Sequence, residues 1–305
     1  MTKYMLIVNP ISGRGSGLKH KALIEKFFNE NQLEYDLVLT ERPGHALELA
    51  QNAVAQGYDI VVAAGGDGTC NEVINGILTG KNVENRKPTM GVLPVGRGND
   101  FAYSMGVASD FDEACEHFLH PTAKMIDVGK VTGGVFPQGR YFGNGVGIGF
   151  DAVVGFEALK LKLLTGFPSY IVAALKTIFL YFKAPRLQLD LDDQQITGRF
   201  LMVSVMNGIR LGGGFFIAPK GDPTDGMFSL CLVNEMGKFA TFPMVLKFMK
   251  GTHEGDPSVR MINCRKINVK AIDGKIPCHA DGETVCEEGS TIEIQLIPAA
   301  LEMVV

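Results

Sequence analysis

Residues Ile60–Glu72, which read IVVAAGGDGTCNE, decide how the first half of the chain folds. An apolar run, Ile60–Val62, leads into three glycines, and the apolar-periodic segment Val73–Leu78 follows them. This order predicts a strand, a glycine turn and the start of a helix, the usual setting for a phosphate at a helix N-terminus. The glycines would let the backbone approach an oxyanion closely and take positive φ where needed.

Asp67 is the unusual residue of this stretch. A carboxylate that faces phosphates is repelled unless a cation lies between them, so the loop predicts a magnesium nucleotide rather than a bare anion. The same string of residues also occurs in ordinary turns. On this stretch alone, both interpretations stay open.

Strand-like and helical segments alternate along the first half of the chain. Strands are expected at Tyr4–Val8, Tyr35–Thr40, Asp59–Ala64 and Pro88–Val95, and helices at Leu18–Phe28, at Gly44–Gln56 and from about Asn71. This alternation predicts an α/β domain with a mainly parallel sheet and helices on both faces. Ligands of such sheets bind beyond the carboxyl ends of the strands.

Two further glycine-rich stretches, Asn9–Gly17 and Gly96–Ala102, each follow an expected strand. Alone, the first could be a flexible connector and the second a turn with Asn99 as a helix cap. Three loops in matched positions favour a nucleotide site at one edge of the sheet. None of them is a Walker loop or a Gly-x-Gly-x-x-Gly dinucleotide fingerprint.

From about Asp127 the pattern changes to short, often alternating strands separated by turns. Strands are expected at Val128–Val131, Tyr141–Phe150, Arg186–Leu191, Phe200–Met206, Met227–Val233, Ile267–Ala271 and Ile292–Leu296. This pattern predicts an antiparallel β-sandwich or barrel-like domain with a few helical insertions.

One helical insertion, residues 156–183, is strongly apolar, carries interspersed lysines and is interrupted at Gly166-Phe167-Pro168. These helices could simply pack on the sheet. Alternatively, they form a basic amphipathic surface that docks at a lipid interface or lines an apolar substrate pocket.

Two polar clusters of the second half have a functional and a structural interpretation. Asp222 and Asp225 lie in a turn-rich stretch that is either a hairpin turn or an oxygen-rich site for a hard cation. Asp281-Gly282-Glu283 is either a turn or a pair of carboxylates that activates a hydroxyl and holds a metal.

Composition narrows the classes of partner. The chain has 305 residues and a net charge of -4, which disfavours bulk attraction to nucleic acid. Its six scattered cysteines form no Cys-x-x-Cys motif and predict reduced thiols in the cytoplasm. The apolar N-terminal run is too short for a signal peptide, and no apolar run approaches the roughly 20 residues that span a bilayer. We therefore expect a soluble protein that is able to meet membranes peripherally.

Taken in chain order, these motifs resemble those of the soluble diacylglycerol kinase-like lipid kinases, whose catalytic domain is shared with sphingosine and ceramide kinases. The motifs are Asn9-Pro10-x-Ser12-Gly13, Gly65–Glu72, Leu93–Ala102, Asp127-Val128-Gly129, Asn207–Pro219, Asp225-Gly226 and Asp281-Gly282-Glu283. The resemblance implies an α/β nucleotide domain like that of phosphofructokinases and NAD kinases over residues 1–126. It further implies a β-rich lipid domain over 127–295, after which residues 296–305 return to the first domain.

The resemblance also implies roles for individual residues. The nucleotide site would comprise Asn9, Pro10, Ser12, Gly13, Arg14, Thr40, Gly65, Gly66, Asp67, Gly68, Thr69, Asn71, Glu72, Arg97, Asn99 and Asp100. Glu283 would be the catalytic base, with Asp281 beside it. A structural magnesium would use Asp225 with main-chain oxygens near Asp222 and Met227, whereas Asp67, Asp100 and Asp127 would belong to the acidic network around catalytic magnesium.

One position departs from the family pattern. The third loop commonly reads Gly-Thr-Gly-Asn-Asp, and Arg97 replaces the threonine here. A threonine hydroxyl can hydrogen-bond a nucleotide, whereas arginine brings a permanent charge and a longer reach. Arg97 either contacts phosphate or turns outward and leaves the contact to the main chain.

The predicted function is therefore transfer of the γ-phosphoryl group of ATP to a lipid hydroxyl, with magnesium. The expected partner is a lipid at a membrane surface; a homodimer is compatible with the sequence, and nucleic acid is not expected. Two alternatives remain: a NAD kinase-like enzyme, which shares the Gly-Gly-Asp-Gly-Thr loop, and a non-catalytic lipid-binding protein.

Overall fold

The computed structural model describes residues 2–82, 86–160, 167–180 and 184–305. The chain forms two compact units: Met1–Ile126 together with Ala299–Val305 make the first, and Asp127–Pro298 the second. The chain passes from one unit to the other within two long strands, β5 (Ala123–Gly133) and β17 (Thr291–Val304).

The first unit contains a parallel sheet in the order β2-β1-β3-β4. Its strands are β1 (Lys3–Val8), β2 (Glu34–Leu39), β3 (Ile60–Gly65) and β4 (Thr89–Pro94). The end of β17 adds a further parallel strand beside β4, with Met303 opposite Met90. The last residues of the chain thus complete the sheet of the first unit.

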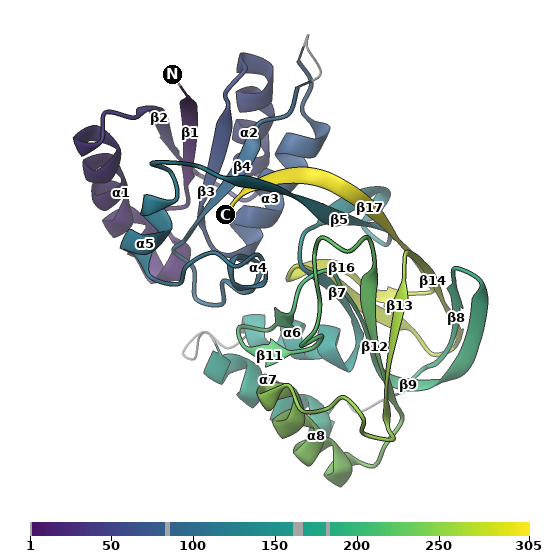
Figure 1. The fold of residues 1–305 in the computed structure, drawn as a ribbon. Coiled ribbons are helices and arrows are strands. Elements are labelled where there is room, and N and C mark those ends of the chain that lie inside the picture. Colours follow the sequence, from purple (N-terminus) through teal and green to yellow (C-terminus); the bar gives the residue numbers. More distant parts are fainter. Residues whose placement is uncertain (1, 83–85, 161–166, 181–183) are drawn as a thin grey trace. The chain divides into compact units, whose positions relative to one another are not determined.

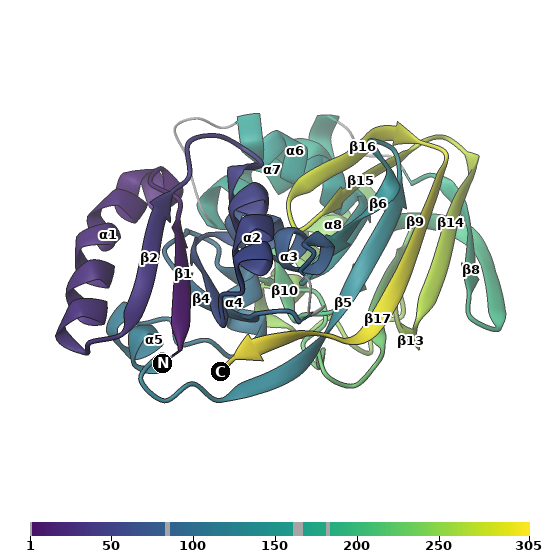
Figure 2. The same ribbon diagram turned by 90° about the horizontal axis from the view of Figure 1, so that it is seen from above.

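Helices cover both faces of this sheet (Figures 1 and 2). They are α1 (Ser12–Glu30), α2 (His45–Gln56), α3 (Asp67–Thr79), α4 (Asp100–Ser104) and α5 (Phe111–Glu116). Leu6 and Val62 share one apolar cluster with Phe28 of α1 and Cys115 of α5. Their strand neighbours are also fully buried and point to the opposite face because side chains alternate along a strand. The predicted α/β class is confirmed.

The second unit is built from antiparallel strands, and its largest apolar cluster lies among them. Besides parts of β5 and β17, its strands are β6 (Phe136–Phe142), β7 (Gly145–Gly149), β8 (Arg186–Leu191), β9 (Gln194–Met206), β12 (Phe228–Asn234), β13 (Val259–Cys264), β14 (Lys266–Asp273), β15 (Ile276–Ala280) and β16 (Glu283–Gly289). A small ribbon joins β10 (Arg210–Leu211) to β11 (Phe215–Phe216). The predicted antiparallel sandwich is confirmed, although β13, β15 and β16 were not among the expected strands.

Strand β9 belongs to two sheet segments. Its first part, Gln194–Arg199, pairs with β8, and its second part pairs with β7 and β12. A strand that changes partners in this way forms the corner of a sandwich. Its buried apolar residues from Phe200 to Met206 are divided between two apolar clusters, with Phe200, Val203 and Val205 in one and Leu201, Met202 and Met206 in the other.

Three helices are inserted between these strands: α6 (Phe150–Lys160), α7 (Phe167–Leu180) and α8 (Lys238–Lys250). The first insertion begins at Phe150 rather than at 156, so the predicted start is wrong. The expected break at Gly166-Phe167-Pro168 agrees with the start of α7, but Gly166 lies outside the described residues. None of the three described helices is long and apolar enough to cross a membrane, and the same holds for the other described helices.

The prediction of one continuous strand over Tyr141–Phe150 is wrong, because the structure has two strands there. Strand β6 ends at Phe142 and β7 begins at Gly145. The two residues between them turn their backbone N–H groups toward the carboxylate of Asp281 instead of a neighbouring strand. A side chain far along the chain therefore interrupts the strand.

Candidate functional site

Three loops of the first unit meet at the carboxyl ends of β1, β3 and β4. Asn9 donates a hydrogen bond from Nδ2 to Thr69 Oγ1 at 3.0 Å, and the backbone N–H groups of Val95 and Gly96 both donate to Gly65 O at 3.0 Å. The first, second and third glycine-rich loops are thus tied to one another within this unit.

Glycine is required where these loops touch. A Cβ atom on Gly96 would lie 2.4 Å from the Gly66 Cα, and one on Gly65 would lie 2.4 Å from Thr69 Oγ1. Real Cβ atoms do not approach other atoms so closely. At Gly96 two main chains therefore pass with no room for a side chain, and at Gly65 the Thr69 side chain fills the space. Loops in which glycines let two backbones come this close are typical of sites that bind phosphate through amides.

The loop after β1 has an unusual backbone conformation. Gly13, Arg14 and Gly15 take three consecutive left-handed conformations, with φ of 58°, 64° and 86°. Arg14 is exposed, and Gly17 has no room for a Cβ atom because Asn9 O would lie at 1.9 Å. Thr40, also named by the sequence, follows β2 and donates its N–H to Val8 O at 2.9 Å.

Asp67 opens α3 and is half-buried. Its Oδ1 accepts a hydrogen bond from Phe101 N at 2.8 Å, which joins the second loop to the start of α4. Asp100 is only 4% exposed. The two carboxylates that the sequence assigned to magnesium and nucleotide therefore lie at adjoining loop ends.

Asn99 has a buried acceptor with no donor. Its φ is 50°, its Nδ2 donates to Gly96 O at 3.2 Å, and its Oδ1 accepts no hydrogen bond from the described residues. A buried polar atom without a partner costs free energy unless a ligand or water satisfies it. Arg97, two residues earlier, is exposed.

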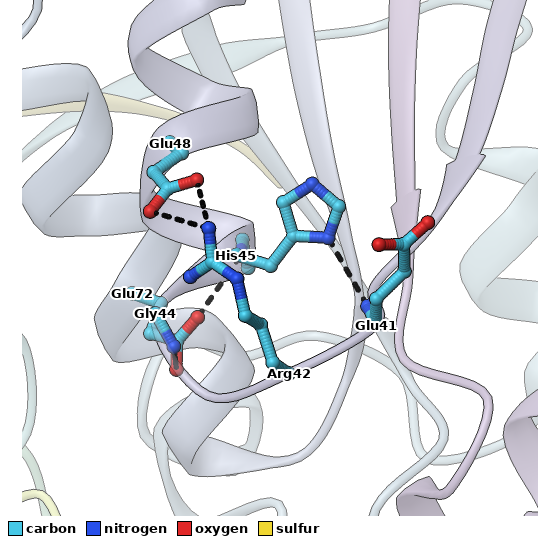
Figure 3. A network of polar contacts seen from close by, with 7 residues as sticks. Glu41, Arg42, Gly44, His45, Glu48 and Glu72 are labelled. Atoms are coloured by element: carbon cyan, nitrogen blue, oxygen red, sulfur yellow. Dashed lines mark hydrogen bonds and ion pairs between the residues drawn. The ribbon is translucent and has the colours of Figure 1, made fainter.

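Glu72 has a task within the fold. Its carboxylate accepts hydrogen bonds from Gly44 N at 2.8 Å and Ala46 N at 3.0 Å and so caps the N-terminus of α2 (Figure 3). Asn71 is fully buried, and its main-chain and side-chain oxygens both accept from Asn75. The structure gives both predicted nucleotide residues partners in the protein.

In the second unit, Asp127 is joined to the loop that carries Asp222 and Asp225. Its Oδ2 accepts from Gly226 N at 2.7 Å, and its N–H donates to Pro223 O at 2.7 Å. Asp127 is 2% exposed, so its position is determined by this loop. The structure therefore groups Asp127 with the predicted structural metal residues.

The loop that carries Asp222 and Asp225 offers oxygen donors, the type of ligand that a hard cation prefers. Asp222 Oδ1 accepts from Thr224 N at 2.9 Å, and Asp225 Oδ1 accepts from Met227 N at 2.8 Å. Each carboxylate has a second oxygen that accepts nothing from the described residues, and carbonyl oxygens lie in the same turn. Oxygen donors of this kind suit magnesium. Among the described residues, however, no three Asp, Glu, His or Cys side chains gather into a metal cluster.

The hairpin turn between β15 and β16 carries one buried carboxylate and one exposed carboxylate. Asp281, with φ of 46°, is 7% exposed and accepts hydrogen bonds from the N–H groups of Gly143, Asn144 and Gly145 at 2.8, 3.0 and 2.9 Å. Glu283 is exposed at the first residue of β16. Asp281 therefore anchors the turn, and Glu283 is presented by it.

His279 supports the same turn, a role that the sequence did not indicate. Its Nδ1 accepts from Gly282 N at 3.3 Å, and its Nε2 lies 3.7 Å from Asp151 Oδ1. Asp151 Oδ2 accepts from Ser204 Oγ at 3.0 Å. The sequence could indicate this role only through the position of His279 two residues before Asp281. Its contact with Asp151 could not be predicted, because Asp151 and Ser204 are distant from it in sequence.

An apolar cavity of about 60 Å³ lies beside this cluster, entirely within the second unit. Its walls include Phe150, Leu201, Leu211, Met244 and Phe248, and Asp151 is the one carboxylate among the described residues that line it. Helices α6, α7 and α8 all contribute to it, but of the predicted insertion over residues 156–183 only Ala174 is among the described lining residues.

Known proteins resemble this chain over both units. Residues 3–131 match the diacylglycerol kinase catalytic domain, and residues 144–305 match the YegS C-terminal NAD kinase β-sandwich-like domain. The diacylglycerol kinase of Bacillus subtilis (strain 168) is 29% identical over 285 residues, which cover 93% of this chain and 90% of that protein. The diacylglycerol kinase of Staphylococcus haemolyticus (strain JCSC1435) is 28% identical over 281 residues, covering 91% of this chain and 81% of that protein.

Solved structures share the fold. A crystal structure of a diacylglycerol kinase from Bacillus anthracis str. Sterne superposes with a TM-score of 0.74 at 21% identity, covering 99% of this chain and 96% of that one. Another chain from the same organism gives a TM-score of 0.80 at 24% identity. Because the match to the C-terminal domain alone spans more than half of the chain and the catalytic domain precedes it, this protein belongs to the diacylglycerol kinase-like family of lipid kinases.

Proposed function

We propose that this chain transfers the γ-phosphoryl group of ATP to a hydroxyl of diacylglycerol or a closely related lipid. The observation that carries the proposal is the meeting of three glycine loops around Asp67, where the Gly66 backbone excludes a side chain at Gly96 and the Thr69 side chain excludes one at Gly65. Such a cradle offers amides to phosphate oxygens, and the unsatisfied Asn99 Oδ1 offers an acceptor to the nucleotide.

The reaction needs a group that removes a proton from the acceptor. The hydroxyl oxygen attacks the γ-phosphorus, the bond from that phosphorus to the β,γ-bridging oxygen breaks, and ADP leaves. Glu283 accepts the hydroxyl proton as the new P–O bond forms. Three amides hold Asp281, whereas Glu283 is exposed, and this difference supports the choice of Glu283 as the base.

Two places in the chain offer oxygen donors that suit magnesium: the loop ends with Asp67 and Asp100, and the loop with Asp222 and Asp225. When bound, the ion would neutralise charge on the transferring phosphoryl group; Asp67, with Asp100 nearby, would hold it with the nucleotide. The loop with Asp222, Asp225 and the main chain of Met227 would hold a structural ion, and Asp127 fixes that loop. The chain's own contribution is to hold amides, Asn99 and Glu283 in place.

The apolar cavity favours a lipid acceptor over NAD. Among the described residues its lining is apolar apart from Asp151 and Thr241, which suits hydrocarbon and leaves little to recognise a dinucleotide, although about 60 Å³ holds only a small part of an acyl chain. We therefore place the lipid in the second unit and the nucleotide in the first. We also propose a cytoplasmic enzyme that meets the membrane peripherally.

The experiment is a panel of acceptors with labelled ATP and magnesium, followed by identification of the product. Diacylglycerol, phosphatidylglycerol, monoacylglycerol, a sphingoid base and NAD are compared with a reaction without acceptor. Turnover that depends on a lipid supports the proposal. Turnover with NAD would favour the NAD kinase alternative, and no turnover with any acceptor would favour a lipid-binding protein.

A further inference from the structure

Three neighbouring strands of the second unit bring His279, Gly147 and Ser204 into one row. His279 of β15 lies opposite Gly147 of β7, and Gly147 lies opposite Ser204 of β9. Residues directly opposite one another on adjacent antiparallel strands place their side chains on the same face of the sheet. Because the middle residue is glycine, the row has a gap between the imidazole of His279 and the hydroxyl of Ser204.

The carboxylate of Asp151, in the first turn of α6, fills this gap. Its Oδ2 accepts a hydrogen bond from Ser204 Oγ at 3.0 Å, and its Oδ1 lies 3.7 Å from His279 Nε2. A Cβ atom on Gly147 would lie 2.3 Å from Asp151 Oδ2 and 2.4 Å from His279 Nε2, so a larger residue there would displace both groups. The side chains of Asp151 and His279 are 17% and 8% exposed, and little solvent therefore screens their attraction.

The hydrogen bonds of His279 define which of its ring nitrogens carries the proton. Gly282 N donates to Nδ1 at 3.3 Å, and a backbone N–H group is a donor only. Nδ1 is therefore unprotonated, and the proton of the ring lies on Nε2, which faces Asp151. A carboxylate beside Nε2 stabilises this tautomer, because the other tautomer would turn a lone pair toward the negative charge. Asp151 thus keeps Nδ1 available to the amide of Gly282.

Gly282 lies between Asp281 and Glu283 in the hairpin turn. Asp281 and Gly282 have φ of 46° and 85°, the left-handed conformations that a two-residue hairpin turn requires. The amides of residues 143–145 hold the first turn residue through its carboxylate, and His279 holds the second through its amide. The backbone that leads into Glu283 is thus held at both residues of the turn.

We propose that His279, kept in the Nε2–H tautomer by Asp151, is a positioning residue that aligns Glu283 with the acceptor hydroxyl. A displacement of about 1 Å at a reacting group can lower a rate by about 10²-fold, so a contact to the turn affects catalysis without touching the substrate. This inference rests on the proposed function, because it takes Glu283 as the base. Among the described residues, the lining of the apolar cavity includes Asp151 but not His279, so variants of His279 separate alignment from lipid binding.

The test compares two amide variants of His279 that retain different parts of the imidazole. In His279→Asn the amide oxygen lies two bonds from Cβ, as Nδ1 does, and is able to accept from Gly282 N. In His279→Gln the amide lies three bonds from Cβ, as Nε2 does, so it faces Asp151 and leaves Gly282 N without this acceptor. Steady-state kinetics with ATP, magnesium and diacylglycerol measure kcat and KM, and thermal melts measure Tm.

The two variants should differ in kcat alone. His279→Asn should keep kcat within about threefold of the wild type, whereas His279→Gln should lower kcat by about ten- to hundredfold. KM for ATP and for diacylglycerol should stay within about twofold in both, because neither substitution removes a contact to a substrate. Their Tm values should agree within about 2 °C, which separates alignment of the turn from a general loss of stability.

A double-mutant cycle tests the role of Asp151. Asp151→Leu removes the charge that selects the tautomer and should lower kcat about fivefold or more in the wild-type background. In the His279→Asn background, which has no tautomer to select, the same substitution should change kcat by less than about twofold. Any effect of Asp151→Leu on the cavity is common to both backgrounds and cancels. The ring ¹⁵N chemical shifts of His279, measured by NMR on the wild-type protein, should show an unprotonated Nδ1.

Four results would overturn the inference: wild-type kcat in His279→Gln, an equal loss of kcat in both amide variants, an equal effect of Asp151→Leu in both backgrounds, or a protonated Nδ1 in the wild-type protein. A wild-type protein that is inactive on every acceptor would refute the proposed function together with the catalytic role of His279. The missing wild-type rate distinguishes that outcome from the four others.

Discussion

At the scale of single residues, the hairpin turn after β15 places the carboxylates of Asp281 and Glu283 in different environments. Asp281 accepts three backbone N–H groups and is buried, whereas Glu283 is exposed two residues later. A carboxylate that satisfies three amides is held by them and is a poor choice for moving protons, because protonation would break those bonds. The hydrogen bonds of Asp281 therefore fix the turn, and the turn fixes the position of Glu283.

Replacing Glu283 should separate catalysis from folding. Glu283→Gln keeps the shape of an exposed side chain and removes the base, so kcat should fall by about 10²–10⁴ with little change in Tm. Steady-state kinetics and thermal melts provide the measurements. Glu287→Gln, exposed on the same strand, is the control and should behave like the wild type. Near-normal turnover of Glu283→Gln would remove the proposed base.

His253 illustrates how burial changes a single titration. The residue follows α8, is fully buried, stacks on Phe248 at 4.1 Å and lies 3.1 Å from Ile217 O through Nε2. Burial lowers its pKa, against the opposing effects of that backbone carbonyl and of Glu254. The imidazole is therefore neutral in the folded protein at neutral pH.

The sign of the resulting pH dependence follows from linkage. As the pH falls below about 6.5, the unfolded chain binds a proton at His253 before the folded chain does, so the free energy of unfolding decreases by up to roughly 1.4 kcal/mol per pH unit. Above that pH the stability is complete. Denaturant melts between pH 5 and 8 should show this slope and a weaker one for His253→Gln. The exposed His120→Gln should retain the wild-type slope; an unchanged slope in His253→Gln would contradict the assignment.

At the scale of elements, the glycine loops depend on strand ends being brought together. The turn after β4 passes the turn after β3 at backbone distance, and Asn9 reaches the first turn of α3. Each loop alone is an ordinary strand-to-helix connection. Their meeting makes a cradle, because parallel strands end at the same edge of the sheet.

Gly96→Ala should therefore affect ligand binding as well as stability. Its Cβ would meet Gly66 Cα at 2.4 Å, so one of the two loops must shift. We expect ATP affinity to fall at least tenfold, measured by calorimetry with magnesium present, and Tm to fall by a few degrees. Gly57→Ala, at an αL helix end with open space around it, is the control and should lose only stability. Wild-type ATP affinity in Gly96→Ala would show that the cradle does not hold the nucleotide.

At the scale of the whole molecule, the chain completes its first unit with its last residues. Leu301, Met303 and Val304 are buried, and Met303 pairs beside Met90 of β4. None of the three belongs to the apolar core of the second unit. The two ends of the sequence are therefore needed for one sheet.

Deleting residues 299–305 should selectively destabilise the first unit. Removal of three buried apolar side chains costs several kcal/mol, at about 2–5 kcal/mol for each large one. Amide hydrogen exchange should show protection lost in β3 and β4 and retained in β9 and β12. Glu302→Ala, which removes only the exposed partner of Thr89 Oγ1, is the control. Equal loss of protection in both units would refute the selective effect.

Much of the fold was accessible from patterns along the chain. The run Ile60–Val62 before Gly65 predicted a buried parallel strand and a helix start, because burial on both faces requires continuous apolar residues and the turn requires glycine. Alternation over Arg186–Leu191 likewise predicted β8. The gap between β6 and β7 was not accessible, because it depends on the carboxylate of Asp281, more than a hundred residues away.

The sequence by itself determined which residue types are available, and from these it predicted the classes of chemistry that we propose: glycine loops for phosphate, carboxylates for magnesium and proton transfer, and apolar helices for lipid. Tertiary structure decided how that chemistry is divided among residues. In the fold, Asp127 is hydrogen-bonded to the loop of Asp225, and Glu72 caps the N-terminus of α2. Asp281 is buried, whereas Glu283 is exposed. These assignments depend on which backbone amides reach a carboxylate, and only the folded chain brings distant amides within hydrogen-bonding distance.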